Sequence, residues 1–330
     1  MVDVKLDVVF EASPWAEILL SPVVYAFGTY LNYLWLMISL GLTMSFYLAS
    51  FYLHGRGSLT LRNVIRTVVP RSVYLHPSAL TDYGCQFVYP AFVLLLSYAG
   101  INVLSESEVG AYVTGTLAVV SAGDLDVSSK LWLTLIVFGV GAMLGDLSQY
   151  IMHVLYHRVP FLWEFHKAHH SAEVLIPFTG ARDHPLIFVS DALAYAATIG
   201  VCVGVLDWLD SGIMDRIYVW QGGAVMFQIY FLGFLTSHYH LPVGYGVLEH
   251  ILVSPAFHMA HHVNHPRYYN CNFGDIFSFW DRLFGTRTEP IKDPTGLEFG
   301  IPRHEQTQYD GLIKLHVTPL VRLLRLPGQK

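Results

Sequence analysis

Long stretches with almost no charged side chains most constrain what this chain can fold into. A helix needs about 20 predominantly apolar residues to cross the roughly 30 Å hydrocarbon core of a bilayer. Five stretches reach that length with at most two charged residues each: 31–53, 85–104, 131–150, 186–208 and 217–237. A single such stretch could be a buried core helix, but five together predict an all-α, polytopic integral membrane protein with about four to five transmembrane helices.

The composition excludes several other classes of protein. Charged residues make up 13% of the chain and apolar residues 53%, whereas soluble proteins carry roughly 25% charged residues. The net charge of −6 provides no basic surface for phosphates, so we expect no nucleic-acid partner. Three cysteines far apart in the sequence form neither a disulfide framework nor a metal-binding CxxC pair.

The distribution of lysine and arginine predicts the orientation in the membrane. With five crossings, residues 54–84, 151–185 and 238–330 lie on one side, and they hold sixteen of the 19 basic residues. Basic residues are enriched in cytoplasmic loops, so we expect this side to be cytoplasmic. The host membrane, a bacterial inner membrane or the endoplasmic reticulum, remains open.

Three histidine motifs fall on the expected cytoplasmic side. They are one HxxxH motif and two HxxHH motifs, made of His153 and His157; His166, His169 and His170; and His258, His261 and His262. On a helix, positions i, i+3 and i+4 are neighbours on one face. Each motif is therefore expected to aim two or three imidazoles at one point.

The histidine count indicates a paired metal site. Imidazole is the commonest metal ligand among side chains, and eight imidazoles exceed what one metal can hold with a position open for chemistry. Two adjacent metals with about four nitrogens each fit that number. No thiolate lies within the motifs, and nitrogen ligands suit iron, copper, zinc or nickel, so the residues alone leave the metal open.

The motifs and their flanks resemble the fatty acid hydroxylase/sterol desaturase superfamily over residues 130–290. The similar segments are Asp146-x3-Tyr150-x2-His153-x3-His157, Trp163-Glu-Phe-His166-Lys-Ala-His169-His170-Ser171, Arg182-Asp-His184-Pro185, Phe257-His258-x2-His261-His262, Asn272-Phe-Gly274 and Trp280-Asp-Arg-Leu-Phe-Gly-Thr286. The resemblance implies two iron ions that activate O2 and oxidise a C–H bond of a lipid. It also implies electrons that come from NAD(P)H through a reductase and a cytochrome b5- or ferredoxin-like carrier.

The sequence departs from the family pattern near the end of the fifth stretch. Family members often carry His-Ser-Asn before Leu-Pro, whereas this chain reads Thr236-Ser-His-Tyr-His-Leu-Pro242. Either His238 or His240 could supply a ninth ligand, and our prediction favours His238. The role of His184 stays open between a partner of a ligand and a residue that faces the substrate.

Two polar residues precede the first motif on the same helical stripe. Asp146, Tyr150, His153 and His157 follow one another at helical spacing. Asp146 lies near the end of an expected span, where an unpaired carboxylate is costly. We expect it either to accept a hydrogen bond from a ligand imidazole or to tie the helix to a neighbouring span, and Tyr150 is a similar candidate.

These observations predict three regions. Residues 1–130 form an N-terminal membrane region, residues 131–290 a catalytic domain with a cytoplasmic histidine-rich cap, and residues 291–330 a cytoplasmic amphipathic tail. The expected function is O2-dependent hydroxylation of a sterol, fatty acyl chain or related lipid. Desaturation at the same site is the nearest alternative, and a non-catalytic metal-binding or metal-transporting membrane protein is the alternative of a different class.

Overall fold

The computed structural model describes residues 33–54, 58–99, 106–118, 130–209, 233 and 236–325. Helices are the only regular secondary structure in these residues, and their only β pairing consists of two isolated bridges, Leu252 with Phe277 and Val263 with Phe299. This confirms the all-α class expected from the sequence. The long helices are α3 (Tyr33–His54), α6 (Pro77–Tyr98), α7 (Glu106–Leu117), α8 (Lys130–Arg158), α10 (Pro185–Leu209) and α16 (Leu312–Arg325). The short ones are α4 (Leu61–Val68), α5 (Arg71–Tyr74), α9 (Pro160–His170), η1 (Pro177–Ala181), η2 (Gly246–His250), α13 (Pro255–His261), η3 (Pro266–Tyr268), α14 (Phe279–Leu283) and α15 (Arg303–Gln306).

Three described helices are long and apolar enough to cross a membrane: Pro77–Tyr98, Trp132–Arg158 and Pro185–Leu209. Their boundaries differ from the expected ones in two places. The stretch expected at 85–104 begins eight residues earlier, at Pro77, because His76 caps the helix with its side chain and a proline suits the first helical turn. The stretch expected at 131–150 continues to Arg158, so the HxxxH motif lies on the same helix.

The structure describes one of the other two expected spans almost completely and the other hardly at all. The stretch at 31–53 corresponds to α3, which runs from Tyr33 to His54. Most of the stretch at 217–237 lies outside the described residues.

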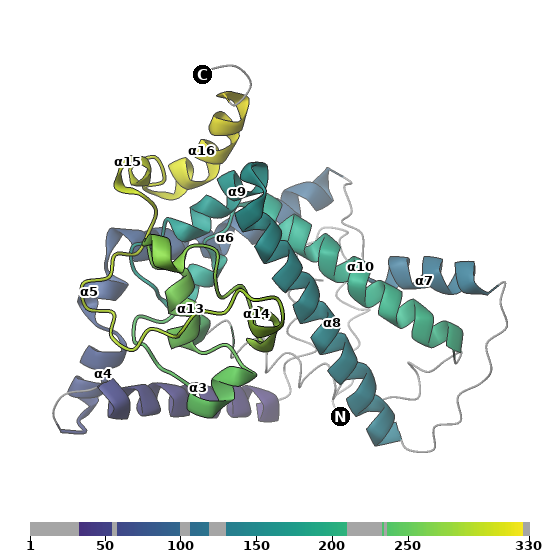
Figure 1. Ribbon diagram of the computed structural model, residues 1–330, viewed down its shortest axis with the longest axis horizontal. Coiled ribbons are helices and arrows are strands. Elements are labelled where there is room, and N and C mark those ends of the chain that lie inside the picture. Colours follow the sequence, from purple (N-terminus) through teal and green to yellow (C-terminus); the bar gives the residue numbers. More distant parts are fainter. Residues whose placement is uncertain are drawn as a thin grey trace, which may run out of the picture.

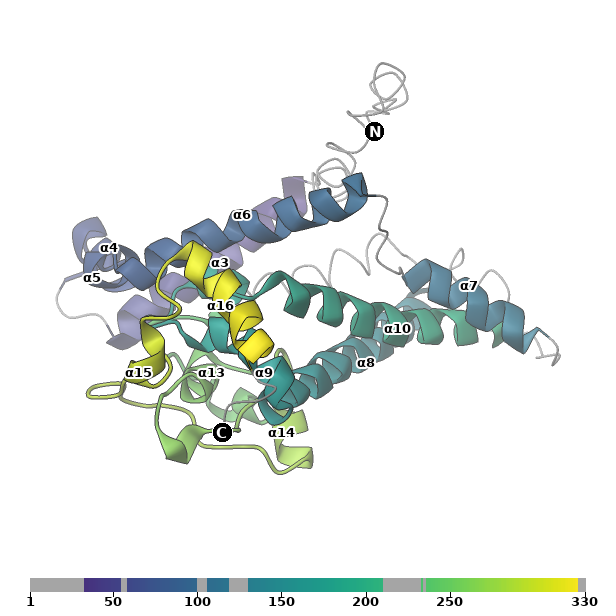
Figure 2. The same cartoon turned by 90° about the horizontal axis from the view of Figure 1, so that it is seen from above.

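Helix α7 lies against one of the apolar helices. Residues 110–122 are too short to span a bilayer, and most of them belong to α7, which packs along α10 (Figure 2). The contact depends on two glycines: a Cβ at Gly204 would lie 2.6 Å from the carbonyl oxygen of Gly110. Thr114 on α7 also donates a hydrogen bond of 3.1 Å to the carbonyl of Gly204. Small residues commonly allow such close contact between membrane helices.

The histidine motifs lie in a cap at the C-terminal end of α8. Figure 1 shows α9 turning away from that end, with α13, α14 and the loops that connect them gathered beside it. Both motif-bearing short helices begin with strong signals. Pro160 is the first residue of α9, and Ser254 caps α13 by accepting a hydrogen bond from the backbone of Phe257. Both short helices are buried in the cap.

The C-terminal helix α16 packs on the cap rather than extending away from it. Leu315 is fully buried against Cys85 of α6 and Tyr309. Arg322 forms ion pairs of 2.7 Å with Glu164 of α9 and 2.9 Å with Glu305 of α15. The segment expected to be an amphipathic tail therefore braces the helix that carries the first HxxHH motif.

Candidate metal centre

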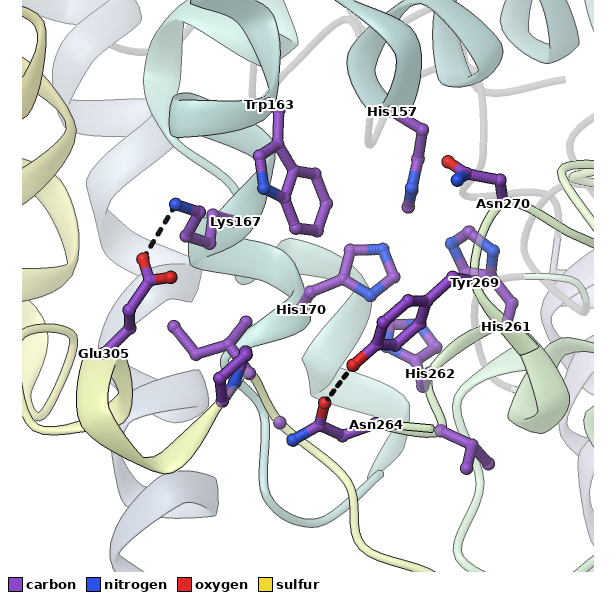
Figure 3. Close-up of a pocket in the computed structure, with 14 residues that line it drawn as sticks. His157, Trp163, Lys167, His170, His261, His262, Asn264, Tyr269, Asn270 and Glu305 are labelled. Atoms are coloured by element: carbon purple, nitrogen blue, oxygen red, sulfur yellow. Dashed lines mark hydrogen bonds and ion pairs between the residues drawn. The ribbon is translucent and has the colours of Figure 1, made fainter. Parts of the chain in front are cut away.

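Nine histidines converge in the cap as two adjacent groups. In each group the potential ligand atoms all lie within 4.8 Å of one another. The larger group contains His153, His157, His166, His170 and His261, and the smaller one His169, His238, His258 and His262. Figure 3 shows three members of the larger group and His262 of the smaller one facing the same cavity. All eight motif histidines and one more are thus brought together.

Each of the two HxxHH motifs contributes histidines to both groups. In the first, His166 and His170 belong to the larger group and His169 to the smaller. In the second, His258 and His262 belong to the smaller group and His261 to the larger. Two imidazoles of each motif therefore point to one group, within the expected two or three, and the third imidazole of each HxxHH motif points to the other group. Positions i and i+4 point to one group, while position i+3 is rotated by about 60° relative to i and points to the other.

The structure distinguishes among the three histidines left open by the sequence. His238 lies in the smaller group, with its Nε2 atom 3.2 Å from Nε2 of His169 and 3.0 Å from Nε2 of His258. The Nε2 atom of His240 instead donates to the carbonyl of Thr67 at 3.1 Å. His184 similarly donates to the carbonyl of His316 at 3.1 Å. His240 and His184 therefore belong to neither group.

The larger group presents buried nitrogens with no hydrogen-bond partner among the described residues. These are the Nε2 atoms of all five members: His153, His157, His166, His170 and His261. Two of the rings have a defined tautomer, because Nδ1 of His153 donates to the carbonyl of Phe273 at 2.9 Å and Nδ1 of His261 to that of Cys271 at 2.7 Å. Their Nε2 atoms therefore carry free lone pairs, which cost about 1–3 kcal/mol each when buried without a partner. A bound cation would satisfy these lone pairs.

The nitrogen atoms of the smaller group have the spacing expected for ligands of one metal ion. Its four Nε2 atoms form a closed ring, with successive separations of 3.2, 3.1, 3.0 and 3.2 Å. Nitrogens bound at about 2.0–2.1 Å to one metal ion would lie roughly 2.9–3.4 Å apart. Burial also lowers the pKa of His258, His262 and His169 well below the usual value for histidine. The rings are thus neutral at pH 7, the state in which imidazole binds a metal.

Asp183 joins the two groups and was missed in the sequence. Its two carboxylate oxygens lie 3.5 Å from Nδ1 of His166 and 3.6 Å from Nδ1 of His169. Each of these histidines belongs to a different group, so one carboxylate lies beside an imidazole of each group. The sequence could have indicated Asp183 only through the motif Arg182-Asp-His184-Pro185. The spacing of that motif in the sequence does not predict that it lies beside the histidines.

Asp146 and Tyr150 contact the site only indirectly. Asp146 accepts hydrogen bonds from the backbone of Ile276 at 2.9 Å and from Nε1 of Trp280 at 2.9 Å, instead of from an imidazole or a neighbouring span as expected. The hydroxyl of Tyr150 bonds to that of Thr286 at 2.8 Å. Both residues hold the loop whose Phe273 carbonyl accepts from His153. Both residues lie on α8 as predicted, but their hydrogen-bond partners belong to a loop more than 100 residues away in the sequence.

Asp281 anchors the same loop from its other side. It accepts hydrogen bonds from the backbone N–H groups of Phe273 at 2.7 Å and Gly274 at 2.8 Å, and from the Thr286 hydroxyl at 2.6 Å. A side chain at Gly274 would collide with this arrangement, because its Cβ would lie 2.7 Å from the Phe277 carbonyl. The loop that orients His153 is therefore rigidly held.

Two cavities open on different sides of the histidines. One of about 310 Å³ is lined on the cap side by Trp163, Lys167, Tyr269 and Glu305 together with histidines (Figure 3). Another of about 180 Å³ is lined by Gln149 and Tyr156 of α8, Phe188 and Asp191 of α10, and further histidines. The paired site is therefore accessible both from the cap and from between the apolar helices.

We expect the replacement Asp183→Asn to weaken metal binding by about 10- to 100-fold, because partners that orient metal-binding histidines typically have effects of this size. The measurement is the metal that the purified protein retains as a chelator is titrated. Asp310→Asn, an exposed carboxylate on the cap, is the matched control. Equal retention by the Asp183 variant and the wild type would show that this carboxylate does not position the histidines.

Comparisons with known proteins give a consistent assignment. Residues 138–286 match the family model described as fatty acid hydroxylase. An ornithine lipid hydroxylase from Rhizobium tropici is 28% identical over 49% of this chain and 44% of its own length. An alkylglycerol monooxygenase from Danio rerio is 30% identical over 44% of the chain and 29% of its own length. A delta(7)-sterol 5(6)-desaturase from Gibberella zeae is 25% identical over 45% of the chain and 41% of its own length.

The matched region coincides with the candidate site. The chain spans less than half the length of these relatives, and no solved structure matches it. The matched residues 138–286 nevertheless contain all nine converging histidines, Asp183 and the loop anchored by Asp146 and Asp281. The part of the chain that carries the candidate site is therefore the part that is similar to the fatty acid hydroxylase family.

Proposed function

We propose that the protein is an O2-dependent membrane oxidoreductase that hydroxylates a C–H bond of a lipid with two iron ions. The observation that carries the proposal is the pair of adjacent histidine groups with buried, unpartnered nitrogen atoms. The larger group would hold one iron ion and the smaller group the other. The relatives named as acting on ornithine lipids, alkylglycerols and sterols support a lipid substrate.

A redox metal is required by the chemistry of the proposed reaction. No side-chain acid or base can cleave an unactivated aliphatic C–H bond, so a metal cofactor must supply O2 activation and electron transfer. The donor set consists of nitrogen alone, which iron accepts. Electrons would come from NAD(P)H through a reductase and a cytochrome b5- or ferredoxin-like carrier, as the family resemblance implies.

The protein's own residues would position and shield the site. The carbonyls of Phe273 and Cys271 orient two ligand imidazoles through their Nδ1 atoms, and Asp183 would do the same for His166 and His169, whose Nδ1 atoms it faces. Trp163 packs against His157 and His170, with ring centroids 5.0 and 5.4 Å apart, and limits the access of water from the cap. The cavity between α8 and α10 would admit the hydrocarbon part of a lipid from the bilayer.

The proposed orientation places the cap in the cytoplasm. The segments that hold most of the basic residues all lie at the cap end of α6, α8 and α10, as the positive-inside rule requires. A cytoplasmic cap would let a soluble or membrane-bound electron carrier reach the cavity beside Lys167 and Glu305. Cysteine introduced at position 305 should react with an impermeant reagent only after lysis, and labelling in intact cells would reverse the orientation.

We expect purified protein supplied with a reductant, 18O2 and its lipid substrate to give a product that contains one 18O atom. Mass spectrometry of the extracted lipids measures the incorporation. A product that lacks two hydrogens and carries no label would establish desaturation, the alternative supported by the sterol desaturase relative. No O2 consumption with any reductant or lipid class would favour a metal-binding or metal-transporting protein.

A further inference from the structure

The segment between α3 and α6 forms a basic surface that the proposed reaction does not use. It contains α4 and α5, which carry Arg62, Arg66 and Arg71. Residues 54–81 include no aspartate or glutamate. Among the described residues, none of these three guanidinium groups forms an ion pair or a hydrogen bond, whereas Arg182 and Arg322 elsewhere are paired with carboxylates.

The same segment exposes an apolar stripe beside the arginines. Leu61, Ile65 and Val69 are 78%, 51% and 43% exposed, and they follow one another at intervals of four residues. Arg62 and Arg66 occupy the next positions around the helix, while Val68 is buried on the side toward the protein. This distribution of apolar and basic faces is typical of a helix that lies in the interface of a membrane.

The apolar and basic side chains together line one open groove. Its lining consists of Leu61, Arg62, Ile65, Arg66, Val69, Pro70 and Arg71, and its volume is about 830 Å³. A groove lined by both guanidinium groups and aliphatic side chains matches a phosphate headgroup with its attached acyl chains. Arginine binds phosphate in a bidentate manner, which adds geometric specificity to the charge attraction.

The position of the segment places it at the bilayer surface. It connects the C-terminal end of α3 to the N-terminal end of α6, and α6 is one of the helices long enough to span a membrane (Figure 2). The Tyr83 hydroxyl of α6 donates to the carbonyl of Tyr74 at 3.0 Å. His240, two residues from His238, donates to the carbonyl of Thr67 on α4. The segment is thus fixed to the protein on both sides at the level where spans end.

We propose that Arg62, Arg66 and Arg71 form a binding site for the headgroup of an anionic phospholipid, with the acyl chains against Leu61, Ile65 and Val69. The proposal is independent of the reaction at the histidines. It commits to a membrane lipid, because the apolar stripe has no role in binding a free phosphate.

Native mass spectrometry of the full-length protein tests the proposal. Protein in detergent is incubated with phosphatidylglycerol or phosphatidylcholine, and retained lipid is counted for the wild type and for Arg62→Gln/Arg66→Gln/Arg71→Gln. Each basic residue near an anionic headgroup contributes about fivefold in affinity. We expect the wild type to prefer phosphatidylglycerol by about tenfold or more, and the triple variant to lose that preference.

Two controls separate this site from general effects of charge. The matched variant Arg267→Gln/Arg282→Gln/Arg303→Gln removes the same charge from exposed positions on the cap and should keep the preference. Inorganic phosphate at the same concentration should not displace the lipid. Three results would each overturn the proposal. They are equal retention of phosphatidylglycerol by the Arg62/Arg66/Arg71 variant and the wild type, an equal loss of the preference in the control variant, and displacement of the lipid by phosphate alone.

Discussion

Replacing any one histidine of either group by alanine should reduce lipid oxidation by about a thousandfold or more, as for residues that act as a unit in catalysis. The reason is that in the proposed reaction two metal ions act together, so the loss of one ligand would disable the pair. His157→Ala and His258→Ala test one member of each group. The measurement is product formed per chain under saturating reductant and O2. A second substitution in the other group should add little to the effect of the first.

The matched controls are histidines outside the two groups. His304 has a side chain that is 79% exposed, and His304→Ala should leave turnover within a few-fold of the wild type. His240→Ala should be milder than His238→Ala, because His240 belongs to neither group and bonds instead to the Thr67 carbonyl. Near-normal turnover in the group variants, together with loss in His304→Ala, would show that the metal site is assigned to the wrong residues.

Arg182→Met should lower the free energy of unfolding by about 3–5 kcal/mol, the cost of breaking a buried ion pair on one side. Arg182 is 2% exposed and its partner Asp82 is fully buried, with 2.7 Å between Nη1 and Oδ1. The guanidinium also donates to the carbonyls of Ser78 and Ala168, so it joins α6 to the end of α9. Thermal or denaturant unfolding in detergent measures the loss.

Two further variants show whether the unpaired charge is the cause. Arg182→Met/Asp82→Asn should be less destabilised than Arg182→Met, because no unpaired carboxylate remains. Arg303→Met removes an ion pair whose side chains are 86% and 59% exposed, and it should cost less than about 1 kcal/mol. A double variant at least as unstable as Arg182→Met would indicate that the packing of the guanidinium matters more than its charge.

The apolar helices were predictable from sequence because hydrophobic length is a local property. Apolar stretches with at most two charged residues identified α3, α6, α8 and α10, whereas the ends of these helices depended on details that hydropathy does not record. Pro77 can begin α6 because a proline fits the first turn of a helix. The last two turns of α8 reach the cap, where Tyr156 is buried and His153 bonds to the Phe273 carbonyl, and only the tertiary structure reveals these contacts.

The histidine site was predictable in its members but not in its arrangement. Motif spacing identified eight histidines, and His238 was favoured over His240 as a ninth, in agreement with its position in the smaller group. His169 lies in a different group from His166 and His170, and His261 in a different group from His258 and His262. This arrangement depends on how α9 and α13 face each other, which sequence spacing does not give. Asp183 was missed for the same reason, since its partners His166 and His169 lie on another helix.

The metal content of protein purified without O2 tests the central claim most directly. The account predicts two metal ions per chain, iron in the active form, because the histidines form two separate groups. His157→Ala/His261→Ala should retain one ion, His258→Ala/His262→Ala the other, and the quadruple variant none. One ion or none in the wild-type protein, or the loss of both ions from either double variant alone, would contradict the account.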